Sequence, residues 1–170
     1  MPLLCALLCA LFLCACNPAL NWRETRIKDT TLVAMMPCKP DAGARAVPLN
    51  GRSVDLHMTG CDAGGATFAI AHADVVEASA VPAVLVQWRT ATLANMGALS
   101  SGEALQGARG AGEPSSLVRV SAQGRRQDGS AVTMQGVWFA RGSQVFHAVV
   151  YAGRISADTS DTFFYGLRFQ

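Results

Sequence analysis

The sequence VRVSAQGRRQDGSAVTMQGVWFARGSQVFHAVVY, residues 118–151, carries the clearest strand signal in the chain. Apolar and polar residues alternate over 118–123 and again over 132–139, which is typical of strands with one face toward a core. Asp128-Gly129 is a favoured turn dipeptide between the two runs. A second turn, at Arg141-Gly142-Ser143, leads into the apolar run 144–151. The stretch therefore predicts a three-stranded antiparallel meander.

Shorter strand patterns precede it. Asn50-Gly51 is a favoured two-residue hairpin turn, and the glycines after Asp62 indicate another turn. Between these turns Val54, Leu56 and Met58 share one face of an alternating run. The strands expected on this basis cover residues 22–27, 31–36, 45–49, 52–61 and 66–71. We expect the first half of the chain to form a second β-meander.

The hydrophobic period changes to that of an α-helix over residues 79–97. Ser79 could cap the helix, Pro82 is tolerated in a first turn, and Gly97 could end it. The expected buried face, at spacings of four, three, four and four, consists of Val81, Leu85, Trp88, Thr92 and Met96, with Val84 and Ala91 beside it. The pattern predicts one central amphipathic helix.

Two further segments complete the expected architecture. Residues 100–116, rich in Gly, Ser and Ala, are expected to be an irregular connection, either a surface loop or a functional one. Residues 157–165 are expected to form a short helix capped by Ser156 or Asp158. Its apolar anchors would be Phe163, Phe164 and Leu167. The predicted fold class is α+β, an antiparallel β-sheet meander with one central amphipathic helix and a short C-terminal helix.

The first sixteen residues indicate where the protein resides. Residues 3–15 contain no charge and no proline, yet the run is shorter than the about 20 apolar residues that cross a bilayer. It has the length of a secretory hydrophobic region. An ordinary cleaved signal peptide and a retained hydrophobic anchor are the alternatives. The polar residues that begin at Asn17, directly after Cys16, favour processing at that cysteine.

The closing tetrapeptide Leu13-Cys14-Ala15-Cys16 resembles a bacterial lipobox. The resemblance implies that the Cys16 thiol receives a diacylglyceryl group, that residues 1–15 are cleaved off as a signal peptide, and that the new amino terminus is acylated, for example with palmitate. Residues 16–21 would then be a lipidated tether and 22–170 a single α+β domain. The absence of Lys and Arg before the apolar run departs from the pattern. Asn17 in place of Asp favours, by the same resemblance, the outer membrane over the inner one, with the domain on the periplasmic side.

The remaining cysteines fit an oxidising compartment. Removal of a leader takes Cys5, Cys9 and Cys14 away, and lipidation uses Cys16, which leaves Cys38 and Cys61. We expect this pair to form a disulfide that contributes roughly 3 kcal/mol. The alternative, a redox or metal-binding pair, normally uses the close Cys-x-x-Cys spacing that is missing here.

The order of elements resembles the PsbP-like α+β fold. The resemblance covers residues 22–170 and depends on the order of elements and on the ending over residues 142–169. Proteins of that superfamily are mostly binding or assembly proteins without an active site. The resemblance therefore implies a non-enzymatic module.

Composition and motifs give no indication of an enzyme or of a protein that binds nucleic acid. The chain has 14 Lys+Arg against 12 Asp+Glu, and this balance does not suggest nucleic acid as a partner. The sequence contains no Gly-x-Ser-x-Gly elbow, no His-Glu-x-x-His and no phosphate loop. We expect no enzyme activity, no cofactor and no metal site. The expected function is a membrane-anchored periplasmic lipoprotein that binds an envelope protein or helps envelope assembly.

Three groups of residues support other hypotheses. A periplasmic hydrolase or metal-handling protein could use Asp74, Glu77 and the three histidines, although acidic residues there also suit a helix dipole. The histidines are His57, His72 and His147, and each is more typical of a hydrogen-bonded strand residue than of a ligand. Four arginines, Arg119, Arg125, Arg126 and Arg141, could contact anionic lipid, or could be a solvated edge that discourages aggregation.

Overall fold

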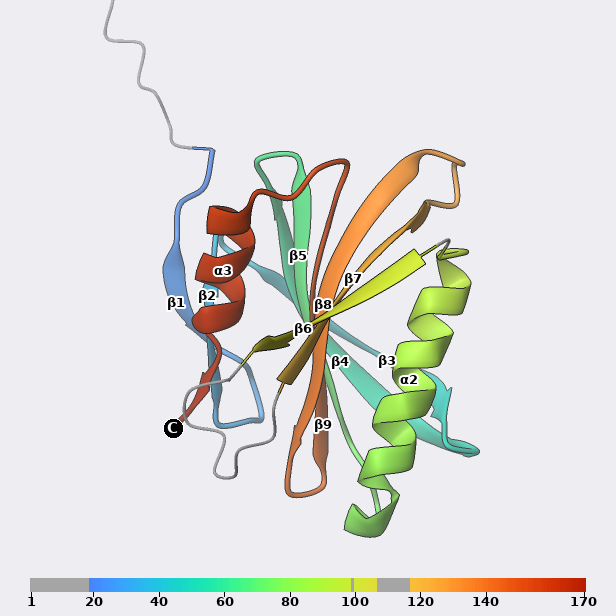
Figure 1. Ribbon diagram of the computed structural model, residues 1–170. Helices are drawn as coiled ribbons and strands as arrows, with labels where there is room; N and C mark the ends of the chain where they lie inside the picture. Colours follow the sequence, from blue (N-terminus) through green and yellow to red (C-terminus); the bar gives the residue numbers. More distant parts are fainter. Residues whose placement is uncertain (1–18, 99, 107–116) are drawn as a thin grey trace, which may run out of the picture.

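The computed structural model describes residues 19–98, 100–106 and 117–170 (Figure 1). The predicted leader, Cys16 and Asn17 lie outside the described residues, as does most of the expected connection over 100–116. The part of that connection that is described is a strand rather than a loop: Ser100–Gln106 pairs antiparallel with the strand Leu117–Arg125. The prediction of an irregular segment was wrong there, because ladder hydrogen bonds to a neighbouring strand can hold residues of low strand propensity.

The described residues form α-helices and antiparallel strands, which confirms the α+β class. In chain order the elements are β1 (Arg23–Arg26), β2 (Leu32–Met36), β3 (Asp41–Leu49), β4 (Arg52–Ala63), β5 (Ala66–Asp74), the 3₁₀ turn η2 (Ala78–Ala80), α2 (Val81–Asn95), β6 (Ser100–Gln106), β7 (Leu117–Arg125), β8 (Ala131–Arg141), β9 (Gln144–Ala152), α3 (Ala157–Tyr165) and β10 (Arg168–Phe169).

The strands form two sheets rather than one continuous meander. The larger sheet has the order β3-β4-β5-β9-β8-β7-β6, so two runs of consecutive strands meet where β5 pairs with β9. The smaller sheet has the order β1-β2-β10. Sequence patterns found most of the strands but not this join, because pairing between β5 and β9 is set by tertiary packing.

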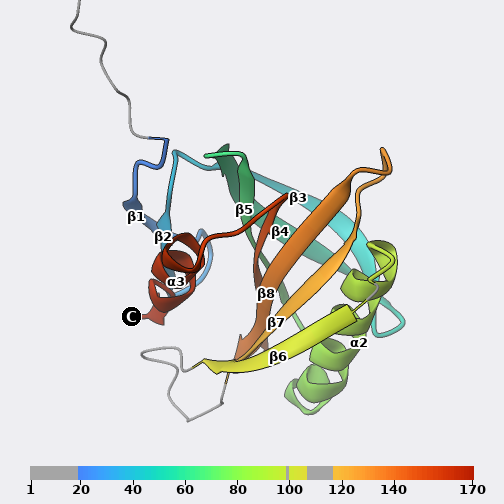
Figure 2. The same cartoon turned by 45° about the horizontal axis from the view of Figure 1, so that its top comes forward.

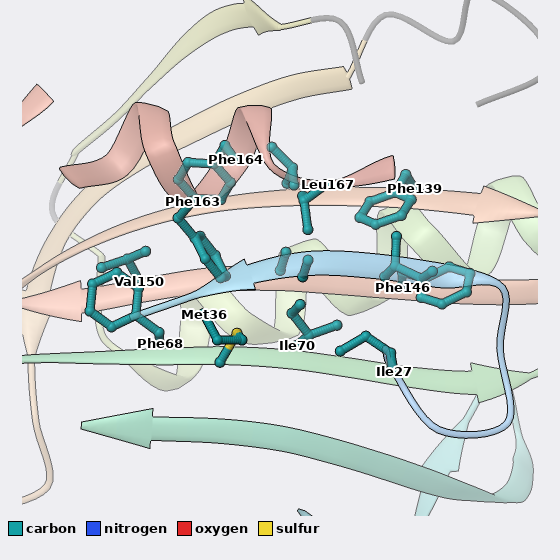
Figure 3. Close-up of a cluster of buried hydrophobic side chains, with 14 residues drawn as sticks. Ile27, Met36, Phe68, Ile70, Phe139, Phe146, Val150, Phe163, Phe164 and Leu167 are labelled. Carbon is teal, nitrogen blue, oxygen red and sulfur yellow. The ribbon is translucent and has the colours of Figure 1, made fainter. Parts of the chain in front are cut away.

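The elements form three layers, and the larger sheet is the middle one (Figures 1 and 2). The helix α2 covers one face, and the small sheet together with α3 covers the other. The main apolar cluster lies under the small sheet and α3, and Figure 3 shows its aromatic side chains meeting from both layers. Phe68 and Phe163 are both completely buried there, with ring centroids 5.5 Å apart.

The helix α2 starts and packs slightly differently from the prediction. Its N-cap is Ala80, without a side-chain hydrogen bond, so the expected Ser79 cap was wrong; Ser79 lies in the preceding 3₁₀ turn. Pro82 does lie in the first turn. Gly97 follows the helix with φ 54°, the left-handed conformation that suits a helix end. Ala91 is exposed rather than part of the buried face.

The C-terminal helix agrees with its prediction. The helix α3 covers the predicted residues 157–165, and the Ser156 side chain accepts a hydrogen bond from the Thr159 backbone N–H. Phe163, Phe164 and Leu167 are buried in the main cluster. The local capping chemistry and the apolar anchors therefore specified this element.

The predicted disulfide is present between Cys38 and Cys61, whose Cα atoms lie 6.1 Å apart. Cys38 follows β2 of the small sheet, and Cys61 lies in β4 of the large sheet. The bond therefore ties the two sheets together covalently.

Candidate functional site

A small pocket of about 130 Å³ lies between the β3–β4 turn and the start of α2. Apolar residues and the polar residues Asn50, Arg52 and Glu77 together form its surface. The lining residues are Leu49, Asn50, Arg52, Val54, Val75, Val76, Glu77, Ala80 and Val84. Ligand sites for drug-sized molecules are about 300–1,000 Å³. The pocket therefore has room for one apolar side chain of another protein rather than for a large cofactor.

Two polar contacts hold the rim of this pocket. A nitrogen of Arg52 lies 3.4 Å from a carboxylate oxygen of Glu77. The Asn50 backbone N–H donates to Oε1 of Gln87 at 2.9 Å, which connects the turn to α2. Val76 is 74% exposed beside the rim. An exposed valine next to an apolar recess is a feature that a protein partner could cover.

Asp74 and Glu77, the proposed acid–base pair, each have a different neighbour in the structure. Glu77 forms its ion pair with Arg52. Asp74 ends β5 in register with Gln144 of β9. The first turn of α2 contains no acidic residue, so neither carboxylate sits there to interact with the helix dipole as the alternative interpretation expected.

The sheet brings two of the three histidines together. His57 of β4 lies directly opposite His72 of β5, and their rings stack with centroids 4.9 Å apart and 11° between the planes. Burial, and to a smaller extent the neighbouring His57, lower the pKa of His72. In stacked rings the nitrogen lone pairs lie in nearly parallel planes and do not converge on a point between the rings. Metal coordination would need a different orientation of the two rings.

His147 lies on the opposite face, under α2. Its ring stacks on Trp138 with centroids 4.2 Å apart, and Trp88 of α2 meets it edge to face at 5.6 Å. Burial lowers the pKa of His147 to about 3. A Cβ on Gly136 would lie 3.0 Å from Nε2 of His147, so the absence of a side chain at Gly136 makes room for the ring.

The tryptophan–histidine stack was not predicted from the sequence, although the hairpin turn contains the necessary information. Next to the turn, Arg141 of β8 pairs with Gln144 of β9. Three residues further from the turn on each strand, Trp138 therefore lies opposite His147. Within the part of the chain that the structure describes, no three residues among His, Cys, Asp and Glu are grouped so as to hold a metal ion.

The four arginines do not form one surface. Arg119 is largely buried, lies 2.7 Å from a carboxylate oxygen of Asp161 in α3 and sits over the Phe164 ring at 4.8 Å. Arg141 donates to Thr31 Oγ1 and to the Gln170 carbonyl oxygen. Both of these arginines connect layers of the fold.

The other two arginines are neighbours at the β7–β8 turn. Arg125 donates to the Gly129 carbonyl oxygen at 2.8 Å, and the Arg126 backbone N–H donates to the carbonyl oxygen of Ser130. Of the four arginines, only Arg125 and Arg126 offer adjacent, exposed positive charge. The anion-contact hypothesis is therefore confined to this turn.

Comparisons with known proteins supply no family. No family model matches the chain, and no curated protein matches it. A crystal structure from Bacteroides thetaiotaomicron VPI-5482 is similar, with 11% identity and a TM-score of 0.46; the similarity covers 82% of this chain and 45% of that one. The protein PA94 from Pseudomonas aeruginosa, of unknown function, is similar with 13% identity and a TM-score of 0.35 over 77% of this chain and 82% of that one.

These similarities carry no functional assignment, because both TM-scores are low and both identities are small. This chain also spans less than half the length of the Bacteroides protein. Among the described helices, none combines the length and apolar character needed to cross a bilayer.

Proposed function

We propose that this protein is a lipid-anchored module on the periplasmic side of a bacterial membrane, and that it binds an envelope protein without catalysing a reaction. The tetrapeptide Leu13-Cys14-Ala15-Cys16 carries the proposal, because it resembles the site at which lipoproteins are processed. Two acyl chains suffice for stable attachment, since each buried methylene contributes about 0.8 kcal/mol. Asn17 favours the outer membrane.

The disulfide supports this location. Disulfides persist in oxidising compartments such as the periplasm and are rare in the cytosol. The bond between Cys38 and Cys61 joins two sheets that meet across the main apolar cluster, where it stabilises the folded domain.

We further propose a PsbP-like relationship for the domain, on the order of its elements. The helix α2 stands between two runs of strands, and α3 closes the chain on the main apolar cluster. Binding and assembly modules of that kind act through surfaces rather than through catalytic clefts. The histidines named for a hydrolase or metal site are divided between the two faces of the sheet, since His72 lies beside Phe146 and His147 stacks on Trp138, so we do not propose that activity.

The pocket beside Val76 is the proposed contact for a protein partner. It accepts one apolar side chain, while the Arg52–Glu77 ion pair at its rim offers polar contacts around that side chain. An apolar centre with a polar rim is the usual anatomy of a protein interface. Substitution of Val76 by Asp would place a charge beside this pocket and should abolish co-purification of a partner.

The anchor is tested with radiolabelled palmitate in living cells. The wild type and a Cys14→Ser variant should both be labelled, since Cys14 lies within the part that is cut away. A Cys16→Ser variant should lose the label and leave the membrane fraction. Labelling of the Cys16→Ser variant at the wild-type level, or no labelling of the wild type, would contradict the proposal.

A further inference from the structure

The strand β3, Asp41–Leu49, is an edge strand of the larger sheet. It pairs with β4 on one side, and no described strand pairs with its other side. Its residues are exposed except for Val47 and Leu49, which are half-buried. An exposed edge with free backbone groups can pair with another strand.

The turn that ends β3 determines which backbone groups point outward. Asn50 and Gly51 have φ values of 50° and 74°, as in the two-residue turns that close on a hydrogen-bonded pair. That closing pair is Leu49 with Arg52. Hydrogen-bonded pairs alternate along an antiparallel ladder, so the even-numbered residues of β3 direct their backbone groups away from β4. Pro48 falls in this outward set, where its missing N–H breaks no ladder bond.

The exposed part of β3 is complementary to itself. In an antiparallel pairing of two copies centred on Gly43, Ala42 lies opposite Ala44 of the second copy, and each such pair exchanges both of its outward hydrogen bonds. The same register places Asp41 opposite Arg45 of the second copy. Within the described residues, Asp41 and Arg45 form no ion pair. Opposite charges in facing positions stabilise such a pair of strands.

Charge also disfavours the neighbouring registers. Pairing centred on Ala42 would place Arg45 opposite Lys39 of the second copy. Pairing centred on Asp41 or on Arg45 would place identical charges directly opposite each other. Like charges in facing positions are destabilising. Pairing centred on Ala44 would place Arg45 opposite Gly43 and Asp41 opposite Val47, so it brings no opposite charges together. Among these registers, only the one centred on Gly43 places opposite charges face to face.

The surface at the centre of this pairing leaves room for a second copy. A Cβ built on Gly43 meets nothing within 4 Å. Met58, directly opposite Gly43 on β4, is 41% exposed on the same face. Facing residues in a pair without hydrogen bonds approach to about 4.5 Å between Cα atoms. Met58 of each copy would then cover the gap that the two glycines leave.

We propose that the occupant of this edge is a second copy of the chain, with the two β3 strands antiparallel and centred on Gly43. The two large sheets then form one continuous sheet in which corresponding faces lie on the same side. Leu20, among the first described residues, packs against the cluster under the small sheet. Both N-terminal ends therefore leave from the same side of the dimer, which suits the anchoring proposed above, although the pairing itself does not depend on it.

The dimer is tested by cysteine cross-linking of the full chain in its native membranes. A Gly43→Cys variant should give a disulfide-linked dimer on non-reducing gels, and peptide mapping should find the link between the two copies of residue 43. Ala46→Cys is the matched control, since it is also exposed on β3, but its two copies would lie about 20 Å apart. Equal cross-linking of the two variants, or none with Gly43→Cys, would overturn the proposal. A link from residue 43 to a different protein would overturn it too, in favour of strand addition by a foreign partner.

A charge exchange tests the register in the Gly43→Cys background. Asp41→Arg places two pairs of like charges across the interface and should reduce the cross-linked fraction about tenfold. Adding Arg45→Asp to the same chain restores opposite charges and should restore the cross-link. Both residues are exposed, so the fold should tolerate the changes. A double exchange that cross-links as weakly as Asp41→Arg would contradict the register.

Discussion

The two faces of the seven-stranded sheet differ in what they bury, although the same strands supply both. Along β9, Phe146, Ala148 and Val150 point to the small sheet and α3 and are completely buried. The alternate residues His147 and Val149 point to α2, where the apolar clusters are smaller. Because a second sheet and a helix cover the first face, which we call the sealed face, the buried side chains of its cluster are at most 4% exposed, whereas those of the clusters under α2 are up to 9% exposed. We infer that the first face supplies most of the stability and that the second, which holds His147 and the half-buried Leu85 and Trp88, supplies less.

The largest effect should come from truncating the sealed face. A Phe163→Ala variant removes a completely buried ring that packs on Phe68, and it should lower the free energy of unfolding by about 3–5 kcal/mol. A Leu85→Ala variant, at a half-buried position of α2, should lower the free energy of unfolding by clearly less. Chemical denaturation with the disulfide intact measures both. Equal losses would mean that the two faces contribute alike.

Removal of the disulfide should have the next largest effect. A Cys38→Ala/Cys61→Ala variant should lose roughly 3 kcal/mol, because the bond closes a loop with a sequence separation of 23 and connects the small sheet to the large one. Denaturant unfolding of this variant and of the reduced wild type should agree. A variant as stable as the oxidised wild type would contradict the structural role of the bond.

The helix-covered face should respond to pH. Burial lowers the pKa of His147 to about 3, so the unfolded chain takes up a proton below about pH 6.5 that the folded chain does not. The free energy of unfolding should therefore decrease as the pH is lowered, by about 2 kcal/mol between pH 7 and pH 5. A His147→Gln variant should lose this part of the dependence, while a His57→Gln variant should keep it. An unchanged slope in the His147→Gln variant would show that the ring is not protected from protonation.

The smallest effect should come from the rim of the pocket. Arg52 and Glu77 form an ion pair whose side chains are more than half exposed. Such pairs contribute about 0.2–1 kcal/mol. A double-mutant cycle with Arg52→Gln and Glu77→Gln should give a coupling energy in that range, and it should shrink in high salt. A coupling energy above this range would show that the pair is shielded from solvent.

The sequence predicted local structure well wherever a short signal was sufficient. Ser156 with its apolar anchors located α3, Asn50-Gly51 located a hairpin, and the even number of cysteines located the disulfide. It did not predict β6, because Ser, Gly and Ala residues give no alternating pattern. Nor did it predict that β5 joins β9, which depends on contacts distant in the sequence.

The candidate site was predicted less completely. The pairing of His57 with His72 and of Trp138 with His147 follows from strand register, which a residue-by-residue search for motifs does not consider. The sequence suggested one group of four arginines because they share a charge. In the structure, however, Arg119 forms an ion pair with Asp161, and Arg141 donates a hydrogen bond to the carbonyl oxygen of Gln170. The pocket at the β3–β4 turn is formed by two segments distant in sequence, so composition alone could not indicate it.

The proposed function depends on the lipid anchor at Cys16, and mass spectrometry of the protein extracted from membranes tests this anchor most directly. We predict that the first residue of the mature chain is Cys16, with a diacylglyceryl group on its sulfur and an acyl group on its nitrogen. A mature chain that begins elsewhere, or that begins at Cys16 with no added lipid mass, would contradict it.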